Sequence, residues 1–334
     1  MKIALVTSKI ESTGGVQIFT RDLSRILRER GHIVSVIGEE SLPPERREDL
    51  ATTDLETVVG EFFTNLNKEK EFDVVVCNGE MGYAVDHPNA INVFHGSYYG
   101  YVKLLRKYMS QEDIDQKGIT SKKQKISAEG KHVITVSNFT KEELEEFGIN
   151  VDGVINNSVD PSLFYPREID LSDHSLSLGR FQYYRKGFDV LEKLADRGVK
   201  IRIFSDAGDA IDNPNIESRP FLDNRLLGKE YSQAQVSIIT PRYDAGQLTL
   251  LEAMACRCPV LTTPVGYGAD IRNVIPEFVV GSVDNIDEFL ERHLEIVGNR
   301  KKYSKQALDY FRTYHDPKTF KREWIELIEG SKAA

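Results

Sequence analysis

The sequence lacks the features that would indicate a membrane span, a secretory signal or a disulfide framework. Its 334 residues include three cysteines, and two of these, Cys256 and Cys258, are separated by one residue, too close for an easy disulfide bond. No apolar run is long enough to cross a bilayer, and polar residues and glycines interrupt the apolar segment at the N-terminus soon after it begins. We therefore expect a cytoplasmic protein in a reducing compartment, with no more than peripheral contact with a membrane.

Acidic residues outnumber basic ones, 52 to 43. The net charge of −9 at pH 7 argues against bulk affinity for nucleic acid or for an anionic membrane. The chain contains no H-E-x-x-H, paired C-x-x-C or G-x-S-x-G motif, so nothing in it indicates zinc or serine hydrolase chemistry. What remains is the composition of a globular protein, 40% hydrophobic and 28% charged, with a length sufficient for two domains.

Apolar runs of strand length alternate with stretches of helical spacing along the chain. Residues 2–7 predict a buried strand, Gly14 and Gly15 a turn, and the apolar residues from Val16 to Leu27 a helix. Because a strand, helix, strand order is typical of parallel sheets, we predict an α/β fold of two doubly wound Rossmann-like domains that face a cleft. Further strands are expected at residues 32–38, 72–77, 91–94, 132–136, 175–178, 199–204, 236–240 and 260–263, and helices are expected to begin near Gly187, Leu226 and Leu248.

The predicted domains are residues 1–157 and 158–312, followed by a C-terminal segment, residues 313–334. In that segment, residues 317–330 form an amphipathic pattern with Phe320, Trp324 and Ile328 on one face. Near the domain boundary, Ser137 or Asn138 is expected to cap a helix.

The most informative segment begins at Asp244 and reads DAGQLTLLEAMACRCPVLTTPVGYGADI. Gln247, Leu248 and Thr249 are expected to open a helix, and the free N–H groups of a helix start suit an anionic ligand such as a diphosphate. Glu252 would lie inside this helix, where a carboxylate can accept two hydrogen bonds from the hydroxyls of a ribose. Asp244 would face the group that is joined to the phosphates. The alternative is that Asp244 is an ordinary cap and Glu252 a solvated helix residue.

Two cations follow the strand expected at residues 175–178. Arg180 comes directly after Gly179, and Lys186 comes six residues later, before Gly187. Fixed cations at a strand end can stabilise the negative charge that develops on a departing diphosphate. The alternative is a pair of solvated surface charges.

The first domain contains two further candidate positions. Gly14 and Gly15 follow the first strand, so the backbone there can approach a phosphate closely. His95 follows the strand at residues 91–94 and could donate a hydrogen bond to a sugar hydroxyl or to a developing anion. The alternatives are a structural turn for the glycines and a histidine bonded to nearby backbone. In the second domain, a nucleotide base is expected to pack near Phe221.

The segment after Asp244 resembles the C-terminal signature of the retaining glycosyltransferases of family four, E-G-F-G-L-x-x-x-E-A-M-A followed by a small residue, a proline and an apolar strand. The Gly-Arg and Lys-Gly pairs at residues 179–180 and 186–187 resemble the phosphate-binding residues of that family. Residues 154–166 are similar to its V-I-x-N-G-V-D-x-x-x-F-x-P segment. The chain departs from the pattern at Asp244, where Glu is usual, and at Gln247, Arg257 and Ser158, where Gly is usual.

The resemblance implies a GT-B fold and a retaining, metal-independent glycosyltransferase. Such an enzyme moves a sugar from a nucleoside-diphosphate sugar to a hydroxyl of a glycan, glycolipid or small molecule, with no cofactor and no covalent nucleophile. By the same resemblance, the C-terminal helix crosses back onto the first domain. The implied catalytic residues are His95, Asp244, Arg180 and Lys186, and the implied donor-binding residues are Gly14, Gly15, Arg180, Lys186, Phe221, Asp244, Gln247, Leu248, Thr249 and Glu252.

Other interpretations stay open. Asp113 and Asp115 form the D-x-D string with which GT-A glycosyltransferases hold Mg²⁺ or Mn²⁺, but here it lies in a polar stretch with no strand before it. A non-catalytic sugar-nucleotide binding subunit or a GT-B sugar-nucleotide epimerase would share the fold. A phosphorylase would need a phosphate or pyridoxal site of its own, which no motif indicates.

The acceptor is the least defined part of the prediction. Residues 98–131 are rich in tyrosine and lysine, and they suggest either a basic amphipathic helix that rests on an anionic membrane or an ordinary helix that lines the acceptor cleft. The residues at helical spacing are Tyr101, Leu104, Leu105 and Tyr108, beside Lys103, Arg106 and Lys107.

Overall fold

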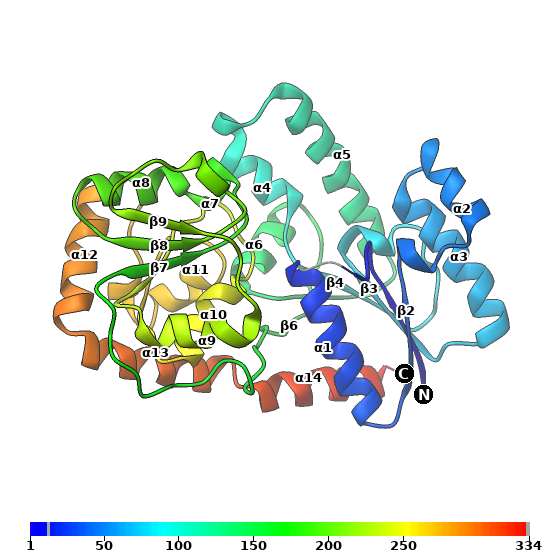
Figure 1. The fold of residues 1–334 in the computed structure, drawn as a ribbon. Coiled ribbons are helices and arrows are strands. Elements are labelled where there is room, and N and C mark those ends of the chain that lie inside the picture. The colour runs from blue at the N-terminus through cyan, green and yellow to red at the C-terminus, as the bar shows by residue number, and fades with distance from the viewer. Residues whose placement is uncertain (12–13, 332–334) are drawn as a thin grey trace. The chain divides into compact units, whose positions relative to one another are not determined.

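A computed structural model describes residues 1–11 and 14–331 of the chain. The chain forms two units of internal contacts, Met1–Asn156 with Lys318–Ala334 and Asn157–Pro317. Each unit has one parallel β-sheet covered by helices (Figure 1). The prediction of an α/β fold with two doubly wound domains is confirmed.

The sheet of the first unit has the strand order β2-β1-β3-β4-β5-β6, with every described pairing parallel. Its strands are β1 (Lys2–Val6), β2 (Ile33–Ile37), β3 (Val74–Asn78), β4 (Ala90–Phe94), β5 (His132–Thr135) and β6 (Gly153–Val154). Its helices are α1 (Gly15–Glu29), α2 (Pro44–Glu48), α3 (Leu55–Lys70), α4 (Tyr98–Leu105), α5 (Gln111–Ala128), α6 (Asn138–Glu146) and α14 (Pro317–Gly330).

Alternate residues of the strands in this sheet enter two separate cores. Ile3 and Leu5 of β1 pack into one core with α1 and α14, whereas Ala4 and Val6 pack into the other with α3. Successive side chains of a strand point to opposite faces, so a sheet with helices on both faces needs apolar residues at every position. This is why β3 and β4 are buried along their whole length.

The helix predicted at residues 317–330 and its apolar face are confirmed. Phe320, Trp324 and Ile328 of α14 are buried, and the Trp324 ring lies edge-on to Phe19 of α1 with 5.3 Å between the centroids. These contacts place α14 in the core of the first unit, although it is the last helix in the sequence.

The sheet of the second unit has the order β11-β10-β7-β8-β9 and is also parallel. Its strands are β7 (Ser175–Leu178), β8 (Ile201–Phe204), β9 (Ile216–Arg219), β10 (Ser237–Ile239) and β11 (Val260–Thr262). Its helices are α7 (Tyr183–Lys186), α8 (Phe188–Asp196), α9 (Asn224–Gln233), α10 (Leu248–Ala255), α11 (Tyr267–Arg272), α12 (Ile286–Gly298) and α13 (Arg300–Tyr314). Short 3₁₀ helices lie at Glu39–Ser41, Asp49–Ala51, Gly79–Gly82, Arg106–Tyr108, Gly208–Ala210 and Pro276–Phe278.

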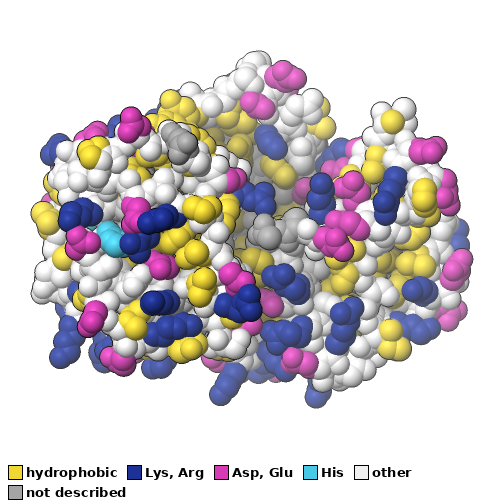
Figure 2. Space-filling model, in the orientation of Figure 1, with side chains coloured by type: hydrophobic (Ala, Val, Ile, Leu, Met, Phe, Trp, Pro, Cys, Tyr) yellow, Lys and Arg dark blue, Asp and Glu magenta, His cyan; other side chains and the backbone are white. Residues whose placement is uncertain are grey.

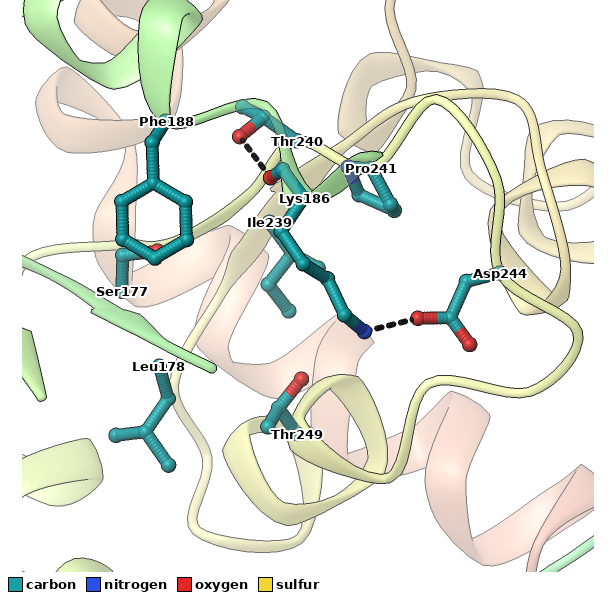
Figure 3. A pocket seen from close by; sticks show the side chains of 9 residues that line it. All are labelled: Ser177, Leu178, Lys186, Phe188, Ile239, Thr240, Pro241, Asp244 and Thr249. Carbon is teal, nitrogen blue, oxygen red and sulfur yellow. Dashed lines mark hydrogen bonds and ion pairs between the residues drawn. The ribbon is translucent and has the colours of Figure 1, made fainter. Parts of the chain in front are cut away.

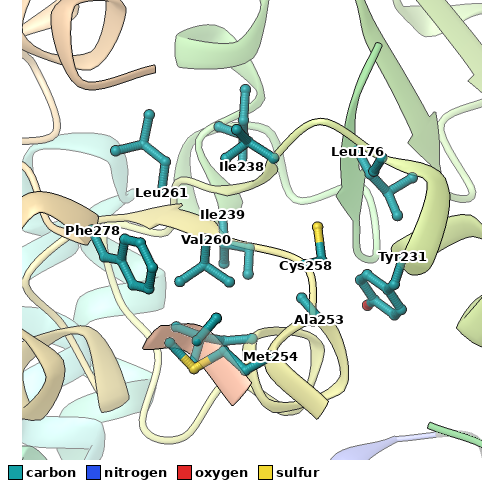
Figure 4. Packing of buried hydrophobic residues seen from close by; sticks show 14 of the residues in the cluster. Leu176, Tyr231, Ile238, Ile239, Ala253, Met254, Cys258, Val260, Leu261 and Phe278 are labelled. Atoms are coloured by element: carbon teal, nitrogen blue, oxygen red, sulfur yellow. The ribbon is translucent and has the colours of Figure 1, made fainter. Parts of the chain in front are cut away.

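In the core of the second unit, α10 packs against β10 and β11. Figure 4 shows Met254 of α10 beside Val260 of β11 and Phe278, and Cys258 close to Tyr231. Cys256 and Cys258 are buried free thiols, as their spacing predicted, and burial raises the pKa of each to about 12.

Every strand expected from the sequence is present, but two strands were missed. β6 has only two residues, and β9 reads IESR, with a single apolar residue and no fully buried position. β9 lies at the edge of its sheet, where a strand has one neighbouring strand and is only partly buried. Such a strand does not need a run of apolar residues, so it lacks the pattern by which the other strands were predicted.

Of the two residues expected to cap α6, the cap is Ser137. Its hydroxyl accepts a hydrogen bond from the backbone N–H of Thr140. The residues noted at helical spacing, from Tyr101 to Tyr108, do not all lie in one α-helix: α4 ends at Leu105, and Tyr108 belongs to the following 3₁₀ helix. Leu105 is buried, whereas Leu104 is 37% exposed, so the two leucines do not share one face.

Figure 2 shows basic and acidic side chains interspersed over the visible face, so the negative net charge is not gathered into one patch there. No helix in the described part of the chain is long and apolar enough to span a membrane.

Candidate active site

The carboxyl ends of β7 and β10 carry the loops that form the candidate site in the second unit. In open parallel sheets, ligands bind beyond this edge. Side chains from both strands, from their following loops and from the first turn of α10 surround a small pocket (Figure 3). The residues that line it are Ser177, Leu178, Lys186, Phe188, Ile239, Thr240, Pro241, Asp244 and Thr249.

Lys186 and Asp244 meet in this pocket as an ion pair. The ammonium Nζ of Lys186 lies 2.5 Å from Oδ2 of Asp244, and the two side chains are 29% and 15% exposed (Figure 3). Burial tends to raise the pKa of Asp244, but Lys186 and Arg185 outweigh burial and hold that pKa below its ordinary value. The structure therefore brings together two residues that the sequence placed 58 positions apart.

The backbone beside Lys186 explains the glycine that follows it. Gly187 has φ of +73°, a left-handed conformation, and a Cβ atom there would lie 2.0 Å from the carbonyl oxygen of Thr240. The Thr240 hydroxyl donates to the carbonyl oxygens of Lys186 and Gly187 at 3.1 and 3.0 Å. The turn that presents Lys186 is thus held directly against the end of β10.

Glu252 lies in the middle of α10 and is buried, with 8% of its surface exposed. Its Oε2 accepts a hydrogen bond of 2.8 Å from the Tyr231 hydroxyl of α9. Burial raises the pKa of Glu252 to about 7, and the hydrogen bond from Tyr231 limits the rise. The alternative that Glu252 is a solvated helix residue is wrong. Tyr231 was not singled out from the sequence, because a lone tyrosine on an amphipathic helix gives no signal of its partner.

Gln247 precedes α10, and both the nitrogen and the oxygen of its side-chain amide make hydrogen bonds. Its amide nitrogen donates to the Val265 carbonyl at 2.8 Å, and its amide oxygen accepts from the Tyr267 N–H at 2.9 Å. Gln247 therefore fastens the start of α10 to the turn before α11. Within residues 1–11 and 14–331, the N–H groups of Leu248 and Thr249 have no hydrogen-bond acceptor, as expected for a helix start.

Arg180 and Phe221 are exposed and do not line the pocket. Arg180 follows the end of β7, and its side chain makes no ion pair with any residue that the structure describes. Phe221 follows the end of β9 and is 48% exposed. Both residues are at the carboxyl edge of the sheet and open to solvent. The sequence predicted this place for Arg180, but not for Phe221, because β9 was missed.

His95 follows β4 in the first unit and is held by a side chain, not by backbone. Its Nε2 lies 2.9 Å from Oδ1 of Asn78 at the end of β3, and Nδ2 of Asn78 donates to the Thr20 hydroxyl of α1 at 2.9 Å. The Thr20 hydroxyl in turn donates to the Val16 carbonyl. This chain of bonds fixes the Asn78 oxygen as the acceptor, so Nε2 of His95 is the protonated nitrogen.

The His95 ring is neutral near pH 7, because burial lowers its pKa to about 4. Its one N–H donates to Asn78, so the remaining nitrogen, Nδ1, can only accept a hydrogen bond. In this arrangement the N–H that was expected to donate to a ligand is bonded to Asn78. Asn78 and Thr20 were missed from the sequence, since neither belongs to a recognisable motif. Gly14 stands directly before α1, which begins at Gly15.

The D-x-D string lies at the start of a helix, and its carboxylates accept hydrogen bonds from neighbouring side chains. Asp113 and Asp115 lie in the first turns of α5, where Asp113 accepts from the Ser110 hydroxyl and Asp115 from the Gln111 side chain. Across the described ranges, no group of three or more His, Cys, Asp or Glu side chains is placed to hold a metal ion.

Comparisons with known families match both halves of the chain. The family described as Glycosyltransferase Family 4 matches residues 13–163, and the family described as Glycosyl transferases group 1 matches residues 173–299. The chain belongs to these glycosyltransferases, which have the GT-B fold, and it is a transferase of this class. None of the curated proteins compared with the chain gives a significant match in sequence.

Solved structures of similar fold extend over almost the whole chain. Sucrose-phosphate synthase from Thermosynechococcus elongatus is 17% identical with a TM-score of 0.80, covering 99% of this chain and 99% of that chain. WaaG, a glycosyltransferase involved in lipopolysaccharide biosynthesis, is 16% identical with a TM-score of 0.73, covering 98% and 100%. HepE of Anabaena, in complex with UDP-glucose, is 14% identical with a TM-score of 0.72, covering 99% and 100%. At these identities the likeness establishes the fold.

Proposed function

We propose that the protein transfers a sugar from a nucleoside-diphosphate sugar to a hydroxyl acceptor, with retention at the anomeric carbon and without a metal ion. The observation that supports this most is the Lys186 and Asp244 pair at the carboxyl edge of the second sheet, beside the open start of α10. A cation, free backbone N–H groups and an acid within one pocket suit a ligand that joins a diphosphate to a hydroxylated ring.

In this mechanism Lys186 exchanges one anionic partner for another. Without donor, its ammonium pairs with Asp244. When the donor is bound, Lys186 and the exposed Arg180 take the diphosphate, and the Asp244 carboxylate is released to accept hydrogen bonds from the sugar hydroxyls. As the bond from the sugar to the phosphate breaks, negative charge grows on the leaving oxygen, and cations already in place stabilise it most.

Glu252 holds the ribose of the donor. Its carboxylate already accepts the Tyr231 hydroxyl and has further lone pairs for two vicinal hydroxyls. Because each donor hydrogen bond stabilises the ionised form, ribose binding lowers the raised pKa of Glu252. Nδ1 of His95, in the first unit, accepts a hydrogen bond from a sugar hydroxyl. The nucleotide base stacks near Phe221.

A UDP-sugar is the first donor to test, because HepE of Anabaena has been crystallised with UDP-glucose. A screen of UDP-, GDP-, ADP- and TDP-sugars by thermal shift would identify the donor, since a ligand that binds only the folded state raises the melting temperature. The acceptor would be sought among glycans, lipid-linked sugars and small hydroxyl compounds. The anomeric configuration of the product, read by NMR, tests retention.

Two outcomes would replace this proposal. A donor that binds without release of nucleoside diphosphate, with or without acceptors, would indicate a non-catalytic sugar-nucleotide binding subunit. Turnover that stops with EDTA and returns with Mg²⁺ or Mn²⁺ would show that the transfer needs a metal.

A further inference from the structure

Arg242 lies in the loop after β10 and is buried, with 5% of its surface exposed. Its guanidinium binds Asp189 of α8 through two bonds, Nη1 to Oδ1 at 2.6 Å and Nη2 to Oδ2 at 2.8 Å. Nη2 also reaches Oδ1 of Asp284 at 3.1 Å, and Nη1 donates to the Tyr184 carbonyl at 2.9 Å. The Arg242 N–H donates to the Arg185 carbonyl at 2.8 Å. One residue thus binds α7, α8 and the segment before α12.

The elements that Arg242 joins are those that carry the ion pair of the pocket. Lys186 is the last residue of α7, directly after Arg185, and Asp244 follows Arg242 by two residues in the same loop. At 2.5 Å, the contact between Lys186 and Asp244 leaves little tolerance for movement of either segment.

We propose that Arg242 and Asp189 are positioning residues that hold the Lys186 turn against the Asp244 loop and so set where the Lys186 ammonium lies. The proposal rests on the function proposed above. A planar guanidinium fixes a carboxylate in both distance and direction, and a lysine at this position would keep the charge but lose the second bond. Lys193, whose Nζ lies 3.6 Å from Asp189, cannot replace it, because its side chain is 54% exposed and belongs to α8 itself, so it does not join α8 to the Asp244 loop.

The test compares Arg242→Lys with a matched substitution, Arg202→Lys. Arg202 also binds two carboxylates in the second unit, Glu217 at 2.6 Å and Glu230 at 2.9 Å, but none of these residues lines the pocket. Arg242→Lys should lower kcat by about ten- to a hundred-fold with little change in the donor KM, because a shift of about 1 Å at a reacting centre has such a cost. Arg202→Lys should change stability without this loss.

A second readout does not depend on turnover. The acetylation rate of Lys186 by acetic anhydride, resolved by peptide mass spectrometry, should rise several-fold in Arg242→Lys, because a displaced Lys186 loses its partner Asp244. It should not rise in Arg202→Lys. Asp189→Asn should act in the same direction as Arg242→Lys and serves if that variant does not fold. Asp284→Asn should have little effect, since Asp284 is 53% exposed and makes the longest of the contacts.

Equal losses of kcat in Arg242→Lys and Arg202→Lys, or an unchanged acetylation rate of Lys186 in Arg242→Lys and Asp189→Asn, would overturn the positioning role. If no donor is turned over by the wild-type protein, the proposed function fails. The acetylation rates still decide whether Arg242 positions Lys186.

Discussion

The hydroxyl of Tyr231 donates a hydrogen bond of 2.8 Å to Oε2 of Glu252, and both side chains are buried in the second unit. Burial raises the pKa of Glu252 from 4.5 to about 7. Between these pH values the folded protein binds a proton that the unfolded chain has released. The free energy of unfolding therefore falls as the pH rises through this window. A group that lowers stability at neutral pH is expected where function requires a buried charge.

Glu252→Gln should stabilise the protein at about pH 8 and change it little at about pH 4. The gain is up to about 3 kcal/mol, because each unit of pKa shift is worth about 1.4 kcal/mol. The same variant should bind nucleoside diphosphate more weakly, since the ribose loses its carboxylate acceptor. Urea unfolding at both pH values and isothermal titration measure the two effects. If Glu252→Gln lowers the free energy of unfolding at both pH values, the ionised Glu252 carboxylate does not destabilise the folded protein.

Lys186→Ala should lower kcat by about 10²- to 10³-fold and affect donor affinity less, because the cation acts most strongly on the charge that develops in the transition state. Lys200→Ala is the matched control, since Lys200 pairs with Asp173 on the surface of the same unit, with both side chains at least 60% exposed. Release of nucleoside diphosphate, followed at several donor concentrations, separates kcat from KM. An equal effect of both substitutions would remove Lys186 from the mechanism.

Gly187→Ala should lower the free energy of unfolding by about 3 kcal/mol or more, because the new Cβ meets the Thr240 carbonyl at 2.0 Å in a left-handed backbone. Gly198→Ala isolates the backbone term: Gly198 has φ of +90° and no atom within 4 Å of a Cβ. That variant should lose only about 1 kcal/mol. Chemical denaturation of both variants gives the comparison. Similar losses would mean that the close approach of β10 to the Lys186 turn is not tight.

His95 should remain neutral with its proton on Nε2 down to about pH 4, because burial lowers its pKa to about that value. Since the unfolded histidine takes up a proton near 6.5, stability should be lost as the pH falls below that value. Nitrogen chemical shifts from NMR identify the tautomer and follow the titration. Asn78→Leu should weaken the preference for Nε2, because Asn78 supplies the acceptor. A ring that is already protonated at pH 6.5 in the wild-type protein would contradict the assignment.

Local patterns were enough to predict the alternation of strands and helices and the residues at the carboxyl edge of the second sheet. Lys186, Asp244, Thr249 and Glu252 follow from strand ends and from the start of α10. The alternation fails at β9, where an edge strand carries one apolar residue.

Contacts between distant segments were not predictable in the same way. Three sets of contacts join residues that are at least 18 positions apart in the sequence. They are the hydrogen bonds of Gln247 to the turn before α11, the hydrogen bond of Tyr231 to Glu252 and the hydrogen bonds of Arg242 to Asp189. A single polar residue does not reveal its partner, because the partner is chosen by the packing of whole elements. These contacts set the pKa values of the side chains in the site. The sequence therefore predicts which residues form the site better than it predicts their protonation states.

The most direct measurement is a crystal structure of the protein soaked with the nucleoside diphosphate that gives the largest thermal shift. The account predicts the diphosphate within hydrogen-bonding distance of Lys186 and the N–H groups at the start of α10, with the ribose hydroxyls on Glu252 and Lys186 separated from Asp244. A nucleotide bound away from these residues, or one bound with the contact between Lys186 and Asp244 intact, would contradict it.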